Sequence, residues 1–116
     1  MDRRIGGIHL KWYQRHVRHL SEALEGLEAG DHREACFHAY QSVVSLLNGI
    51  LGFDPYAPAP TVKALPALIK KVQEKPPESV LRCATCLERN YYDGVDGERC
   101  VKCAELITDY LHTFIT

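Results

Sequence analysis

The chain has 116 residues, of which 46% are hydrophobic and 25% charged, and its formal net charge is −1. These values are typical of one globular domain covering residues 1–116, and they give no overall basic footprint for nucleic acid. No run approaches the roughly 20 apolar residues of a membrane span, and the N-terminus has no apolar signal segment. We therefore expect a cytoplasmic protein with no membrane partner.

The first predicted element is a helix from Ile5 to Ala29, where hydrophobic residues recur at helical spacing. No stretch of the chain shows the strict alternation of apolar and polar residues that is typical of a strand. The sequence therefore predicts an all-α fold.

The stretch from Asp31 to Gly52 is the most informative part of the chain. At helical spacing its apolar residues cover about twice the width of the apolar stripe on an ordinary surface helix. Asp31, with Glu34 three residues later, resembles a capping box at the start of a helix. We interpret this stretch as the central helix of a small bundle, in contact with other helices on more than one side.

The remaining face of this central helix carries small, uncharged residues, whereas a long solvated face usually carries Lys and Glu. Small residues allow another helix to approach closely, so we expect this face to be covered. The simplest cover is a second copy of the chain in a two-fold homodimer, and a polar groove for a ligand is the alternative. The candidate residues of this dimer or ligand face are His38, Gln41, Ser42 and Ser45.

Three further helices are predicted after the central one. Prolines make Phe53 to Thr61 an extended connector, and a short helix follows from Val62 to Val72. The next helix runs from Pro77 to Tyr91, the composition of Asp93 to Gly97 predicts a turn, and the last helix runs from Glu98 to Ile115. The whole is an antiparallel up-down bundle of four main helices plus one short helix.

Four of the five cysteines form two Cys-x-x-Cys pairs, Cys83 with Cys86 and Cys100 with Cys103. The pairs are symmetric about the predicted turn, so antiparallel helices would place Cys83 opposite Cys103 and Cys86 opposite Cys100. The four side chains can then form two disulfides in those pairings, bind one zinc ion as thiolates, or remain reduced thiols. A cytoplasmic location opposes disulfides, and all three possibilities stay open. The fifth cysteine, Cys36, lies on the apolar arc and is expected to be a small core residue.

The central stretch resembles the second helix of the HEPN domain family. The connector with the segment TVKALPALIKKV, and the segment ERNYYDG from Glu88 to Gly94, resemble the parts of the family that follow. The resemblance implies an antiparallel HEPN-like bundle that is often dimeric. It adds Arg89, Tyr92 and Asp93 to the candidate ligand-binding or dimer face. The matching residues of the central stretch are Gly30, Asp31, Arg33, Ala35, Ala39, Tyr40, Gln41, Ser42 and Val43.

HEPN proteins include ribonuclease toxins, partners of minimal nucleotidyltransferases, and modules associated with nucleotide binding. The family's ribonucleases carry an arginine followed within a few residues by a histidine near the start of the last helix. The segment after Arg89, NYYDGVDGERC, has no histidine. Arg33 and His38 have a suitable spacing, but on one helix they point about 140° apart.

The resemblance therefore implies a non-catalytic HEPN module in a toxin–antitoxin-like system, binding a nucleotide or a minimal nucleotidyltransferase partner. One alternative is a metal-independent ribonuclease that uses Arg33 and His38 or another such pair. The other is an interaction protein stabilised by disulfides or zinc. No cofactor is implied beyond the possible zinc ion.

Overall fold

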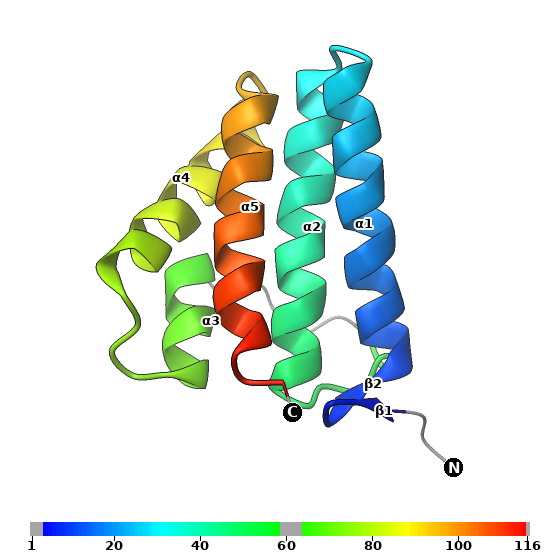
Figure 1. Ribbon diagram of the computed structural model, residues 1–116, viewed down its shortest axis with the longest axis vertical. Coiled ribbons are helices and arrows are strands. Elements are labelled where there is room, and N and C mark those ends of the chain that lie inside the picture. Colours follow the sequence, from blue (N-terminus) through cyan, green and yellow to red (C-terminus); the bar gives the residue numbers. More distant parts are fainter. Residues whose placement is uncertain (1–3, 59–63, 116) are drawn as a thin grey trace.

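Five helices form an antiparallel bundle in the computed structural model, which describes residues 4–58 and 64–115 (Figure 1). Four of them are long and α3 is short, which confirms the predicted all-α bundle of four main helices plus one short helix. No helix within these ranges is both long enough and apolar enough to cross a membrane. The helices are α1 (Leu10–Glu28), α2 (His32–Ile50), α3 (Leu65–Val72), α4 (Glu78–Asp93) and α5 (Gly97–His112).

The N-terminal segment is a small hairpin and not the first turn of α1. Strand β1 (Arg4–Ile5) pairs antiparallel with β2 (Ile8–His9). Gly6 and Gly7 connect them with φ angles of 56° and 86°, the left-handed conformation that a two-residue hairpin turn requires. The predicted helix start at Ile5 was therefore wrong. The helix begins only after His9, whose side chain caps it.

Helix α2 is the centre of the bundle and contacts α1, α3, α4 and α5 (Figure 1). Eleven of its 19 residues are buried, including Leu46 and Leu47 with no exposed surface. Asp31 caps the helix, because its carboxylate accepts a hydrogen bond of 3.1 Å from the backbone N–H of Glu34. The contacts on several sides and the capping role of Asp31 are confirmed, but the box is not closed, because the Asp31 N–H donates to the Gly26 carbonyl and the Glu34 carboxylate contacts His38.

The predicted turn between the last two main helices reverses the chain as expected. Gly94 ends α4 with a φ of 66°, a left-handed conformation that favours glycine. Asp96 then caps α5 through its side chain. Helices α4 and α5 therefore pack against each other in antiparallel orientation, and α5 also packs on α2.

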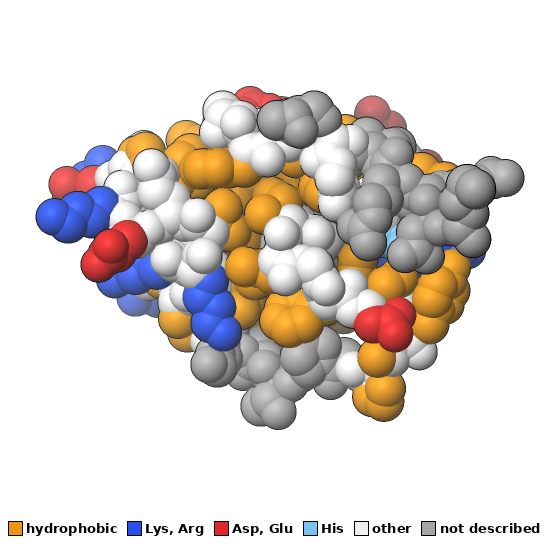
Figure 2. All heavy atoms as spheres, turned by 90° about the horizontal axis from the view of Figure 1, so that it is seen from below, with side chains coloured by type: hydrophobic (Ala, Val, Ile, Leu, Met, Phe, Trp, Pro, Cys, Tyr) orange, Lys and Arg blue, Asp and Glu red, His pale blue; other side chains and the backbone are white. Residues whose placement is uncertain are grey.

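The connector after α2 is held at one end of the bundle, where hydrophobic side chains are visible across the middle of the surface (Figure 2). Trp12 Nε1 donates a hydrogen bond of 2.7 Å to the Phe53 carbonyl, and Arg15 donates one of 2.9 Å to the Pro55 carbonyl. The Arg15 guanidinium also lies 4.8 Å from the centre of the Trp12 ring. Two predicted boundaries, the end of the connector at Thr61 and the start of the third helix at Val62, lie outside the described residues.

Candidate functional site

An aromatic patch lies where α2 and α4 meet, and we define it as Phe37, Tyr91 and Tyr92 on a base of buried Tyr40. The Tyr40 and Tyr91 rings are stacked with centroids 4.2 Å apart. Tyr91 is also stacked with Phe37 at 6.1 Å and meets the edge of Tyr92 at 5.2 Å. Phe37 is 40% exposed and Tyr92 is 73% exposed. Tyr40 thus holds Tyr91 in place, while the outer rings present aromatic surface to solvent.

Two arginines flank the aromatic patch. Arg33 lies one helical turn before Phe37, and a Cβ atom placed on Gly94 would be 3.4 Å from its Cγ, so Arg33 packs against the α4–α5 turn. Arg89 is three residues before Tyr92, which puts both on the same side of α4. In the part of the chain that the structure describes, neither arginine is ion-paired with a carboxylate. Their guanidinium groups are therefore available to an anionic ligand.

The patch itself carries no negative charge from Tyr40. Burial raises the pKa of Tyr40 to about 12, and the neighbouring Glu88 carboxylate adds to the rise. The phenol therefore stays protonated at neutral pH. Exposed aromatic rings beside unpaired arginines can bind a nucleotide, because a base stacks on the rings and a guanidinium binds phosphate.

The structure separates the residues of the predicted ligand or dimer face. Arg89, Tyr92 and Asp93 lie together on the last turns of α4, at the aromatic patch. Gln41 is partly exposed on α2. The other three residues, all from α2, face α1 or lie in the core. Phe37, Tyr91 and Arg33 were missing from the predicted site. Arg33 and Phe37 are four residues apart on α2, and this helical spacing could have indicated that they lie on one face.

The small-residue face of α2 is covered by α1 of the same chain. The Ser42 hydroxyl donates a hydrogen bond of 2.9 Å to the His16 carbonyl and lies 2.8 Å from His16 Nδ1. Burial lowers the pKa of His16, so the ring is neutral and its Nδ1–H donates to Ser42. Ser42 and Ser45 are only 0% and 5% exposed.

The prediction that Ser42 and Ser45 line a dimer or ligand face was therefore wrong. Small residues on this face do indicate close approach by a helix, but the approaching helix is α1. The packing is tight at Gly49, where an added Cβ atom would lie 2.5 Å from Ile8 Cγ2 of β2 and 3.0 Å from Trp12 Cβ of α1. The homodimer remains a prediction, without this face as its interface.

His38 points toward α1, where it joins a group of polar side chains. Its Nδ1 lies 2.9 Å from His19 Nδ1 and 3.0 Å from Glu22 Oε2. Its Nε2 lies 3.0 Å from Glu34 Oε2. Sequence reasoning missed these three neighbours. The sequence does show His19 with Glu22, and Glu34 with His38, at helical spacing. These two pairs form one cluster when α1 packs against α2.

The cysteines do not act as one group of four. Cys100 forms a disulfide with Cys36 on α2, with their Cα atoms 5.1 Å apart. The predicted Cys86–Cys100 bond was therefore wrong, and a zinc site built from all four paired cysteines cannot form with Cys100 in this bond. The reason is that Cys100 faces the central helix and not α4. Cys83, Cys86 and Cys103 are free thiols, so the predicted Cys83–Cys103 bond is also absent here.

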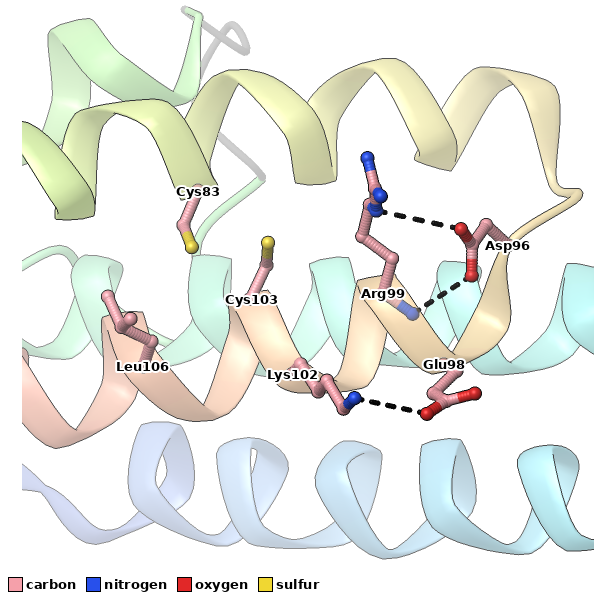
Figure 3. A pocket seen from close by; sticks show the side chains of 7 residues that line it. All are labelled: Cys83, Asp96, Glu98, Arg99, Lys102, Cys103 and Leu106. Carbon is pink, nitrogen blue, oxygen red and sulfur yellow. Dashed lines mark hydrogen bonds and ion pairs between the residues drawn. The ribbon is translucent and has the colours of Figure 1, made fainter.

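A pocket of about 400 Å³ lies beside two of these thiols. Cys83 and Cys103 point toward each other from α4 and α5, in the opposed positions that the sequence predicted (Figure 3). Burial and hydrogen bonding with Cys83 raise the pKa of Cys103, so this thiol is protonated at neutral pH and weakly nucleophilic. The pocket is lined by Cys83, Asp96, Glu98, Arg99, Lys102, Cys103 and Leu106.

The charged residues of this pocket already neutralise each other (Figure 3). Arg99 lies 3.6 Å from the Asp96 carboxylate, and Lys102 lies 3.1 Å from the Glu98 carboxylate. An anionic ligand would therefore have to compete with a local carboxylate for each cation. The aromatic patch, whose arginines have no carboxylate partner among residues 4–58 and 64–115, is the better candidate site.

The fold defines an antiparallel bundle of four main helices and one short helix, with an aromatic and basic surface where the second and fourth meet. The chain belongs to the HEPN domain family, whose model matches residues 9–113. It is similar to the crystal structure of ST0689, an archaeal HEPN homologue, with a TM-score of 0.70 and 24% identity over 90% of this chain and 95% of that one. No curated protein matches the sequence. The resemblance found in the central stretch is thereby confirmed.

Proposed function

We propose that this chain is a non-catalytic HEPN module that binds a nucleotide at the aromatic patch and works with a minimal nucleotidyltransferase, as in a toxin–antitoxin-like system. The observation that carries the proposal is the exposed surface of Phe37 and Tyr92, each one helical turn from an arginine, Arg33 or Arg89, that has no carboxylate partner among the described residues. The rings provide stacking surface for a base, and the guanidinium groups of Arg33 and Arg89 provide donors for phosphate oxygens.

The geometry argues against the ribonuclease alternative. Arg33 packs against Gly94 at the α4–α5 turn. His38, five residues later on α2, has both ring nitrogens directed at Glu22, Glu34 and His19. A general base and a cationic phosphate-binding group must meet at one scissile bond, and these two side chains diverge.

Truncation of Tyr92 is expected to weaken nucleotide binding by roughly tenfold or more, because stacking of one base on an aromatic ring contributes about 1–3 kcal/mol. Isothermal titration calorimetry with ATP, GTP, CTP and UTP, and with adenosine for comparison, measures the effect. Tyr92→Ala should weaken the binding of ATP and adenosine alike. Arg89→Gln should weaken ATP and spare adenosine, which has no phosphate.

Tyr56 offers a matched control, since it is a 69% exposed tyrosine in the connector, away from the patch. Tyr56→Ala should leave both affinities unchanged. A wild-type protein that binds none of the four nucleotides would overturn the proposal. So would a Tyr92→Ala variant that binds ATP as tightly as the wild type does.

The purified protein is expected to leave single-stranded RNA intact, because Arg33 and His38 do not converge. Gel analysis of a labelled RNA incubated with wild type and with His38→Ala is the measurement. Cleavage that is lost in His38→Ala would contradict this prediction and favour the ribonuclease alternative. Cleavage that persists in the variant would indicate a contaminating nuclease.

The partner part of the proposal is tested by genome neighbourhood. A gene for a small nucleotidyltransferase next to the gene for this chain is expected, and the two proteins should elute together in size-exclusion chromatography after co-expression. Absence of such a neighbour would favour the third possibility, an interaction protein stabilised by its disulfide. Sedimentation of the chain alone tests the proposed homodimer.

A further inference from the structure

The cluster between α1 and α2 has the composition of a metal site. Two imidazole nitrogens and one carboxylate oxygen, from His19, His38 and Glu22, all lie within 4.8 Å of one another. The two Nδ1 atoms lie 2.9 Å apart, and His38 Nδ1 lies 3.0 Å from Glu22 Oε2. Three side chains from neighbouring helices therefore bring their possible ligand atoms together between α1 and α2.

We propose that His19 Nδ1, His38 Nδ1 and Glu22 Oε2 bind a zinc ion that bridges α1 and α2. Zinc is bound in proteins by histidine nitrogen and carboxylate oxygen at about 2.0–2.2 Å in a tetrahedral arrangement. Two ligand atoms in such a complex lie roughly 3.3 Å apart. The separations of 2.9 Å and 3.0 Å need to open by a few tenths of an ångström, and the two rings, whose Nδ1 atoms face each other, need to turn toward a common point for the ion to enter.

The surroundings of His38 suit a ligand histidine. A metal-binding imidazole usually donates its second N–H to a carboxylate, which fixes the ring and raises its basicity. His38 has this arrangement, because its Nε2 lies 3.0 Å from Glu34 Oε2, one helical turn away. The Phe37 ring meets the His38 ring at 5.0 Å and restricts it further. The side chain is 15% exposed, so the ring is positioned yet remains reachable from solvent.

The other two ligands are held beside His38. The His19 and His38 ring centroids are 5.2 Å apart with Nδ1 facing Nδ1, so the His19 ring nitrogen stays next to that of His38. Glu22 uses Oε1 for an ion pair of 3.8 Å with Arg18 Nε and turns Oε2 toward His38. Glu22 is 37% exposed, which leaves room for a water molecule as the fourth ligand.

Without a metal, hydrogen bonds can account for the short contacts of His38 with His19, Glu22 and Glu34. His38 as an imidazolium would donate Nε2–H to Glu34 and share Nδ1–H between Glu22 and His19. The two explanations differ in one observable respect, because only the metal site gives saturable binding of zinc that depends on these side chains. The proposal does not rest on nucleotide binding, and Tyr92→Ala should retain the full zinc affinity.

Calorimetric titration of the metal-free protein with zinc tests the proposal. The wild type should bind one equivalent, and His19→Gln and His38→Gln should each lose roughly 100-fold or more in affinity. Glu34→Gln should lose about 10–100-fold, as expected for the residue that orients a ligand histidine. Glu25→Gln is the matched control, since Glu25 is exposed on α1 one turn beyond Glu22, and its affinity should equal that of the wild type.

The three free thiols are a competing place for zinc, and cobalt distinguishes the two sites. Cobalt bound by nitrogen and oxygen gives visible d–d absorption, whereas thiolate ligands add an intense charge-transfer band in the near ultraviolet. Zinc should also raise the Tm of the wild type and leave that of His38→Gln unchanged, with circular dichroism showing that the variant is folded. Absence of one-equivalent binding, retention of affinity in His38→Gln, or a thiolate band would each overturn the proposal.

Discussion

Reduction of the Cys36–Cys100 disulfide is expected to lower the free energy of unfolding by about 4 kcal/mol. The bond joins residues that are 64 apart in the sequence, so breaking it restores a large amount of conformational freedom to the unfolded chain. Neither cysteine has exposed surface. Urea unfolding followed by circular dichroism, with and without a reductant, measures the difference.

The double variant Cys36→Ala/Cys100→Ala is the control for this experiment. Its unfolding should be the same with and without reductant, while Cys103→Ala should retain the full effect of reduction. Alanine is preferred to serine because a buried hydroxyl without a partner would add its own cost. Thiol titration of the denatured, unreduced protein should find three free thiols. A count of all five would show that the bond does not form.

Gly49→Ala is expected to destabilise the protein by about 2 kcal/mol, although alanine is the better helix former by roughly 1 kcal/mol. The added Cβ atom would lie 2.5 Å from Ile8 Cγ2 and 3.0 Å from Trp12 Cβ. Both neighbours are buried, so relief requires β2 or the start of α1 to move away from α2. Chemical denaturation of the variant against the wild type gives the change.

A double-mutant cycle identifies the clash as the cause. Ile8→Ala removes the nearest atom, so Ile8→Ala/Gly49→Ala should be less destabilised than the sum of the two single variants. Additive effects would contradict the packing described here. A Gly49→Ala variant as stable as the wild type would do so as well, since it would show that α1 and α2 are held less closely.

The helices could be predicted because their signals are local. Hydrophobic spacing, the capping Asp31 and the glycine-rich turn after α4 each act within a few residues, and the structure places helices where they indicate. The N-terminal hairpin was missed because two residues per strand are too few to show alternation. The adjacent glycines Gly6 and Gly7 indicate a hairpin turn, but Ile5 and Ile8 were interpreted as residues at helical spacing.

The candidate site could be predicted only in part, because most of it depends on how helices pair. Tyr92 and Arg89 were found through the family resemblance of their segment. Cys100 was assigned to the wrong partner because symmetry about the turn considers α4 and α5 alone, while the core presents Cys36 to the same side chain. Ser42 was assigned to a dimer or ligand face because the sequence alone does not show which helix covers a face of small residues.

Three consecutive residues of α2 connect to three different parts of the molecule. Cys36 is bonded to α5, Phe37 belongs to the aromatic patch against α4, and His38 meets the polar side chains of α1. Successive side chains of a helix point about 100° apart, so three adjacent residues of α2 reach three different neighbouring helices. A shift of α2 that disturbs one of these contacts would act on the other two. Any resulting coupling is reciprocal: if occupancy of one surface altered the redox equilibrium of the bond, the redox state would alter the affinity of that surface by the same free energy.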